Sequence, residues 1–261
     1  MAPPHTSGAD PSRAASTHAH APHEHGLADL HLHTLASDGL MSVQALLDYA
    51  ERSTRLDVVA ITDHDETQAA LEGREYVARK GYRVQVIPAV EVTTSEGHLL
   101  ALFVEERPPA LRPMAQTAEW VLRRGGLCLA PHPFTRWTHS LSDRVLQHAA
   151  ERSLIAGVEV LNASPAGRAS RPKALRFAEQ RSLATVGGSD AHMLRIVGLA
   201  RTRFTGRTPD DLRRAILARA TTVEGRFARP GEIAAEALPQ LARSMLHLPA
   251  RRVIRHLRRT G

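Results

Sequence analysis

Short apolar runs alternate with longer amphipathic segments over most of the chain. The runs have four to six apolar residues and end in polar residues or glycine, in segments such as LADLHLH, DVVAITDHD, VQVIPAVE, HLLALFV, LCLAPHPF and LATVGGSDAH. Runs of this length are typical of buried strands. The intervening segments, such as MSVQALLDYAERS with Ser42 as its predicted N-cap, have apolar residues at helical spacing. The alternation predicts an α/β fold, a TIM-like barrel of seven strands and their helices.

The same pattern divides the chain into three parts. Residues 1–26 are rich in Pro, Ala, Ser and His without periodicity, which predicts a disordered His-rich tail. Its histidines could gather metal ions, but compositional bias is the favoured interpretation. Residues 27–229 form the predicted barrel domain. Pro230 and Gly231 mark a boundary, and residues 230–261 are expected to form a basic amphipathic helical extension outside the core.

Length and composition agree with one large core. The chain has 261 residues, of which 43% are hydrophobic. It has no apolar stretch of about 18 residues, so no transmembrane segment is expected, and its start lacks the apolar region of a secretory signal. Cys128 is the only cysteine and lies in the apolar run LCLAP, which favours a core residue over a nucleophile. These features favour a cytoplasmic protein.

The net charge of +7 comes from arginine, because only Lys80 and Lys173 are lysines among the 34 basic residues. Much of the excess lies in the C-terminal segment RSMLHLPARRVIRHLRRTG. A weak contact with nucleic acid or with an anionic surface is one interpretation of this tail. A solvated basic helix is the favoured one.

Nine residues that can bind metal lie at or just after the ends of the apolar runs. They are His31, His33, Asp38, His64, Glu91, His98, His132, Asp190 and His192. Barrel strands deliver such side chains to their C-terminal rim. Imidazole and carboxylate without thiolate suit Zn, Mn or Fe, and nine groups exceed the four of a closed zinc site. We therefore expect two or three divalent ions.

The motifs around these residues resemble those of the PHP (polymerase and histidinol phosphatase) domain family. The resemblance rests on HLHT with a following SDG, on TDHD, on HP in LAPHPF and on GSDAH, and it covers roughly Leu27 to Phe227. It implies a distorted seven-stranded (β/α)7 barrel with the metal site at the C-terminal rim of the strands. It also implies that the nine residues above are the family's usual ligands.

The resemblance further implies how the ligands are grouped. His31, His33 and Asp190 would hold a first ion with Glu91, which would bridge to a second ion held by His98 and His132. Asp38, His64 and His192 would hold the third. Glu91, Asp190 and His192 are the ligands expected to act in catalysis. Asp63 and Asp65, which flank His64, are expected to orient ligands or cap a helix.

Such a centre predicts hydrolysis of a phosphate ester by a hydroxide that bridges the metal ions. Arg136, Arg168 and Arg195 follow strands on rim-side loops, where a guanidinium could clamp a second phosphate. His139 could protonate a leaving oxygen. The expected substrate is a nucleotide, an oligonucleotide end or a small phosphometabolite such as histidinol phosphate.

Two other functions stay open. Similar metal clusters hydrolyse C–N bonds in amidohydrolases, and some PHP domains attached to polymerases act as non-catalytic interaction domains. The complete ligand set and the rim arginines favour the phosphoesterase.

Overall fold

A computed structural model describes residues 25–135, 138–234 and 237–247 of the chain. The predicted N-terminal tail therefore lies almost entirely outside the described residues, as do Arg136 and the last part of the basic extension. Within the described residues, one sheet of nine strands has the order β7-β6-β5-β4-β3-β2-β1-β8-β9. The strands are β1 (His25–Leu32), β2 (Val58–Ile61), β3 (Gln85–Thr93), β4 (His98–Leu102), β5 (Leu127–Ala130), β6 (Gly157–Asn162), β7 (Ala184–Gly188), β8 (Ala200–Thr205) and β9 (Thr222–Gly225).

The sheet curls into a nearly closed barrel. The backbone N–H of His33, just after β1, donates to the carbonyl of Ala191, just after β7, at 2.9 Å. Farther along the same junction, the N–H of Gly187 in β7 donates to Oγ1 of Thr202 in β8 at 2.8 Å, so β7 also contacts a strand near the other end of the sheet. The two halves of the sheet are parallel, β1-β2-β3 and β5-β6-β7.

The expected count of seven strands is corrected to nine. Strands β8 and β9 come after the last metal-binding motif. Strand β8 pairs antiparallel with β1, and β9 pairs antiparallel with β8. Strand β4 is also antiparallel to both of its neighbours. Only a tight turn with Gly97 at φ 143° separates it from β3, and so short a link can join only antiparallel strands. The barrel is therefore not a uniform βα repeat.

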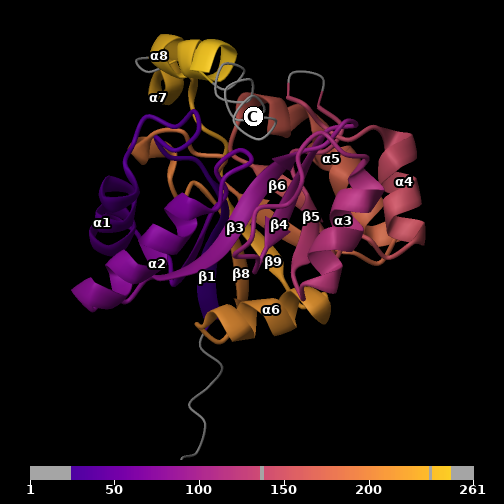
Figure 1. Cartoon of the computed structure of the whole chain (residues 1–261), viewed down its shortest axis with the longest axis horizontal. Helices are drawn as coiled ribbons and strands as arrows, with labels where there is room; N and C mark the ends of the chain where they lie inside the picture. The colour runs from indigo at the N-terminus through magenta and orange to yellow at the C-terminus, as the bar shows by residue number, and fades with distance from the viewer. Residues whose placement is uncertain (1–24, 136–137, 235–236, 248–261) are drawn as a thin grey trace, which may run out of the picture.

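Helices cover the outside and one end of the barrel. They are α1 (Val43–Ser53), α2 (Gln68–Lys80), α3 (Met114–Arg123), α4 (Asp143–Glu151), α5 (Pro165–Gln180), α6 (Pro209–Leu217), α7 (Pro230–Ala234) and α8 (Ala237–Ala242), with a 3-10 turn η1 (Leu194–Ile196) and a π-helical turn η2 (Arg243–His247). Helix α6 lies at one end of the molecule, and α7 and α8 lie at the other (Figure 1). None of the helices in the described ranges has the length and apolar character needed to cross a membrane.

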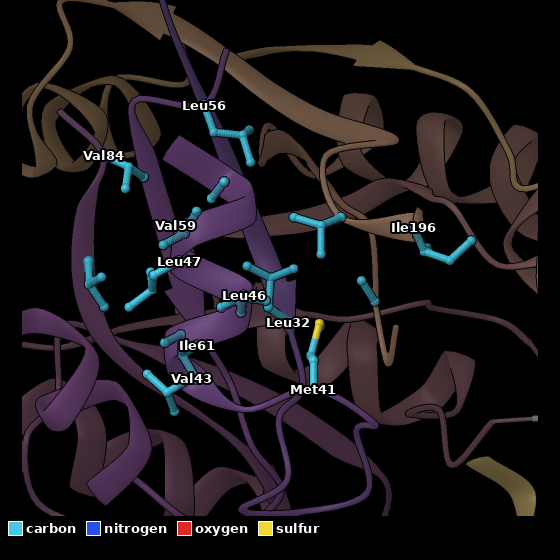
Figure 2. Close-up of a cluster of buried hydrophobic side chains, with 14 of the residues drawn as sticks. Leu32, Met41, Val43, Leu46, Leu47, Leu56, Val59, Ile61, Val84 and Ile196 are labelled. Atoms are coloured by element: carbon cyan, nitrogen blue, oxygen red, sulfur yellow. The ribbon is translucent and has the colours of Figure 1, made fainter. Parts of the chain in front are cut away.

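The packing of α1 shows why its sequence forms that helix. The Ser42 side chain accepts from the N–H of Ala45 at 3.1 Å, which confirms the predicted N-cap. Leu46 and Leu47, on the apolar face of α1, pack with Leu32 of β1 and Ile61 of β2 (Figure 2). A second cluster fills the barrel interior and includes Leu212 and Ile216 of α6, so this helix closes the end opposite α8.

Candidate metal centre

A β-bulge in β1 brings two histidines to the barrel mouth. The register with β2 shifts between Asp29 and Leu32, so β1 has one more residue than its partner there. Leu30 belongs to the interior cluster, whereas Leu32 packs outside against α1. Without the bulge, strict alternation would place His31 on the outside with Leu32 inside. The bulge therefore lets the apolar interior and the two-histidine motif share one strand.

Glu91 lies at the centre of the cluster. Its Oε1 is 2.9 Å from Nδ1 of His98 and 3.0 Å from Nε2 of His132. Its Oε2 is 3.2 Å from Nδ1 of His64. The same oxygen is 3.3 Å from Nε2 of both His31 and His33. One buried carboxylate thus faces two groups of imidazoles with its two oxygens, which is the arrangement of a bridging ligand.

Two aspartates complete the cluster from the rim loops. Oδ1 of Asp190, which has the left-handed φ of 54°, is 3.3 Å from Nε2 of His33 and 3.5 Å from Nε2 of His31. Oδ1 of Asp38 is 3.2 Å from Nε2 of His192 and 3.8 Å from Nε2 of His64.

All nine residues predicted as ligands therefore come together. Their donor atoms form four groups within 4.8 Å: His33, Asp38, His64 and His192; His31, Glu91 and His132; His31, His33 and Asp190; and His64, Glu91 and His98. The predicted first and third sites each have their counterpart in these groups, whereas His98 and His132, predicted to share the second site, fall in different groups that have Glu91 in common.

The donor atoms suit metal ions. Within the described residues, Nε2 of His31, Nε2 of His33, Nδ1 of His64 and Nδ1 of His98 are buried and make no hydrogen bond. Buried polar atoms of folded proteins are normally paired. Imidazole nitrogens that lie close to carboxylate oxygens can find their partner in a divalent cation, which binds both kinds of atom. The residues therefore fit a cluster of ions.

The cluster also keeps its carboxylates charged. Burial alone would raise the pKa of Glu91, but the histidines around it, His98 and His64 first, lower that pKa well below its usual range. Conversely, burial lowers the pKa of His192, but the carboxylates of Asp38 and Asp190 beside it raise that pKa to about 9. Binding of cations would displace protons from such imidazoles.

Glu159 is a buried residue in contact with the cluster that the sequence analysis did not single out. It lies in β6, and its Oε1 is 3.2 Å from Nδ1 of His31. Its Oε2 accepts from the backbone N–H of His132 at 2.6 Å and from Nδ2 of Asn162 at 2.9 Å. A carboxylate on the far nitrogen of a ligand histidine fixes the tautomer and the ring orientation. A single acidic residue in the apolar run GVEVLN was the available clue.

Asp63 contacts the loop that carries Asp38, which agrees with the expectation that it orients a ligand. Its carboxylate accepts from the N–H of Thr34 at 2.7 Å and from Oγ of Ser37 at 2.5 Å. These bonds fix the loop that carries Asp38. Asp65 accepts from the N–H of Thr93 at 2.7 Å and so fixes the end of β3.

A cavity of about 580 Å³ opens beside the cluster. His139 lines it, with its ring 5.1 Å from that of His98. Arg168 is exposed on α5, 5.0 Å from the ring centre of Phe227, and Arg195 is exposed in η1. Among the described residues that line the cavity there is no arginine. Arg136 lies outside the described residues, and of the three predicted substrate contacts that the structure describes, His139 alone lines the cavity.

Comparisons with known proteins agree with this geometry. The family model described as PHP-associated matches residues 169–221. An uncharacterized protein of Methanocaldococcus jannaschii is 32% identical over 147 residues, which are 52% of this chain and 81% of that protein. The 5'-3' exoribonuclease Rnm of Salmonella typhimurium is 40% identical over 104 residues, which are 38% of this chain but only 35% of the enzyme.

A solved structure is similar over most of the chain. It is a two-domain protein of Bacteroides vulgatus that contains a predicted PHP-like metal-dependent phosphoesterase, and it superposes with a TM-score of 0.67 at 19% identity, covering 85% of this chain and 70% of that one. At this identity the likeness bears on the fold. Together with the sequence matches, it shows that this chain belongs to the PHP family.

Proposed function

We propose that this protein is a metal-dependent phosphoesterase. The observation that carries the proposal is Glu91, buried between five imidazoles that meet its two oxygens at 2.9–3.3 Å. A domain that served only as a scaffold for a partner would gain nothing from burying so many titratable groups at one rim. The likeness to the Rnm exoribonuclease supports an ester at a nucleotide or an oligonucleotide end as the substrate, with a small phosphometabolite as the alternative.

The nine residues would hold two or three divalent ions. Asp190 with His31 and His33 would hold one, His98 and His132 a second, and Asp38 with His64 and His192 a third. Glu91 would bridge the ions through its two oxygens. When bound, such ions lower the pKa of water and neutralise charge on phosphate oxygens.

The protein's own groups position the reaction. Glu159 holds the His31 ring through Nδ1, which leaves Nε2 directed at the cluster. Ser140 and Thr138 lie 3.2 Å and 3.1 Å from Nδ1 of His132 and fix that ring in the same way. His139, at the cavity wall, would give a proton from a ring nitrogen to the leaving oxygen.

The test is to strip the purified protein of metal, reload it with Mn or Zn, and measure both metal content and hydrolysis. The panel contains 5'-phosphorylated oligoribonucleotides, nucleotides, histidinol phosphate and a set of amides. We expect two or three ions per chain and turnover of a phosphate ester. At most one tightly bound ion after reloading would refute the cluster, and turnover of amides alone would make this protein a C–N hydrolase.

A further inference from the structure

The C-terminal segment 230–247, in its described part, lies over the mouth of the barrel. Its start is fixed by Glu232, which accepts from Nη2 of Arg226 at 2.6 Å and from the N–H of Arg229 at 2.7 Å. At its other end, Nη2 of Arg243 donates to the carbonyls of Leu35 and Ser37, each at 3.1 Å. Figure 1 shows α7 and α8 together at this end of the molecule, opposite α6. The segment is thus attached to the loop that carries Asp38.

This segment supplies one wall of the cavity beside the metal centre. Ile233, Leu241 and Met245 line the cavity together with Met193 and Ile196 from the region of η1. Leu241 and Met245 are 46% and 65% exposed, although both face a cavity whose floor is the polar cluster. Apolar side chains left open beside convergent polar groups are typical of ligand sites.

We propose that Ile233, Leu241 and Met245 bind the organic part of the substrate and select an uncharged group with an apolar face there, which fits a nucleotide or a small phosphometabolite better than a charged oligonucleotide chain. The proposal rests on the proposed function, since the phosphoryl group would occupy the metal end of the same cavity. Binding of the non-reacting part of a substrate by such a wall determines which ester is chosen.

Calorimetry with two non-hydrolysable phosphonates tests this wall on the metal-loaded protein. Phenylphosphonate and methylphosphonate share the anionic group and differ in the apolar part. We expect wild type to bind the phenyl compound more tightly, and the double variant Leu241→Ala, Met245→Ala to lose about tenfold of that preference. Leu238→Ala is the matched control, because Leu238 is 79% exposed on the same helix and does not line the cavity.

If the double variant bound both compounds with the preference of wild type, the proposed role of this wall in selecting the organic group would be refuted, and the phosphoesterase proposal would stand. If wild type bound neither phosphonate but hydrolysed an ester of the panel, the role of the wall alone would be refuted; if it also hydrolysed no ester, the proposed function would be refuted with it. Thermal melting of each variant is the control for a retained fold.

A separate observation concerns the two oxygens of Asp38. Oγ of Ser244 donates to Oδ2 at 2.5 Å, whereas Oδ1 faces His192 at 3.2 Å and His64 at 3.8 Å. The bond from η2 holds the carboxylate with Oδ1 toward the imidazoles. We infer that Ser244 is a positioning residue that builds the third ion site, so that the C-terminal segment and that ion stabilise each other.

Metal titration by calorimetry separates this role from a merely structural one. Ser244→Ala should weaken one ion by about tenfold or more and leave the others unchanged, because outer-shell partners of ligands contribute affinity of this size. Ser244→Thr, which keeps the hydroxyl, should restore it. Equal affinities of wild type and Ser244→Ala for every ion would overturn the inference, as would a loss that threonine fails to restore.

Discussion

Replacing Glu91 with glutamine tests the centre of the site most directly. The change preserves the shape of a side chain that is only 1% exposed, but it removes one charge and turns one oxygen into an amide nitrogen. If the remaining oxygen faces His98 and His132, the amide nitrogen replaces the oxygen that faces His31, His33 and His64. An amide nitrogen cannot accept a hydrogen bond or bind a cation.

The size of the loss follows from these contacts. The oxygen that becomes an amide nitrogen faces three imidazoles. If each contact with the charged oxygen contributes about 1.5–3 kcal/mol, as a hydrogen bond to a charged group does, losing all three costs about 4.5–9 kcal/mol. At about 1.4 kcal/mol per tenfold, the rate should fall by about a thousandfold to about a millionfold.

The assay measures kcat and metal content of Glu91→Gln on the best ester of the panel. Glu75→Gln is the matched control, because Glu75 is 72% exposed on α2 and should keep full activity. Circular dichroism should show that both variants keep the barrel. If Glu91→Gln retained more than about a tenth of the activity with its metals unchanged, Glu91 would not be the bridge.

Three further outcomes are expected. Glu159→Gln should lower metal affinity or kcat by about 10–100-fold, since it releases the His31 ring; equal metal affinity and kcat in titration and kinetics would refute its role. Burial raises the pKa of the Cys128 thiol, so a thiol reagent at pH 8 should react with the urea-unfolded chain but not with the folded protein; rapid labelling of the native state would contradict this. Deleting residues 251–261 should leave hydrolysis of a small ester unchanged; if the deletion instead weakens RNA binding and flattens its log–log salt slope by about 0.7–0.9 per phosphate contact, the tail binds nucleic acid.

The convergence of the nine candidate ligands could be predicted because most of them lie next to an apolar run, where local sequence and barrel geometry agree. His64 follows β2 and Asp190 follows β7, as the pattern indicated. The bulge of β1 could not be predicted, because it depends on pairing with β2 and leaves no mark in the composition. His31 and His33 therefore reach the mouth by a route that simple alternation does not describe.

The two additional strands escaped prediction for a different reason. Strand β8 has the sequence ARTRFT, in which exposed or half-buried positions alternate with buried Thr202 and Phe204. The buried positions of this strand alternate with more exposed ones, and one of them is the polar Thr202, so no continuous apolar run marks the strand. Strand β9 is half-buried at most and lies at the sheet edge.

The place of the C-terminal segment is likewise a matter of tertiary structure. Its amphipathic pattern predicted a helix outside the core, but the pattern does not say which surface the apolar face covers. The contacts of Arg243 and Ser244 with the loop from Leu35 to Asp38 settle that. Helix α7 begins at Pro230, where the boundary was expected, yet the segment lies against the site rather than apart from it.

The charges of the centre bear on the choice between ester and amide. Six of the nine candidate ligands are imidazoles, which bind cations as neutral groups, and three are carboxylates. With three ions, the larger of the two numbers that we propose, six positive charges meet three ligand carboxylates and the buried Glu159, which leaves a charge of about +2. A phosphate ester dianion cancels this charge in a cavity where burial strengthens electrostatic interactions, whereas a neutral amide leaves it uncompensated. The imidazole-rich composition of this centre therefore favours an anionic substrate, and an apolar wall opposite the ions then needs to recognise only what the phosphate is attached to.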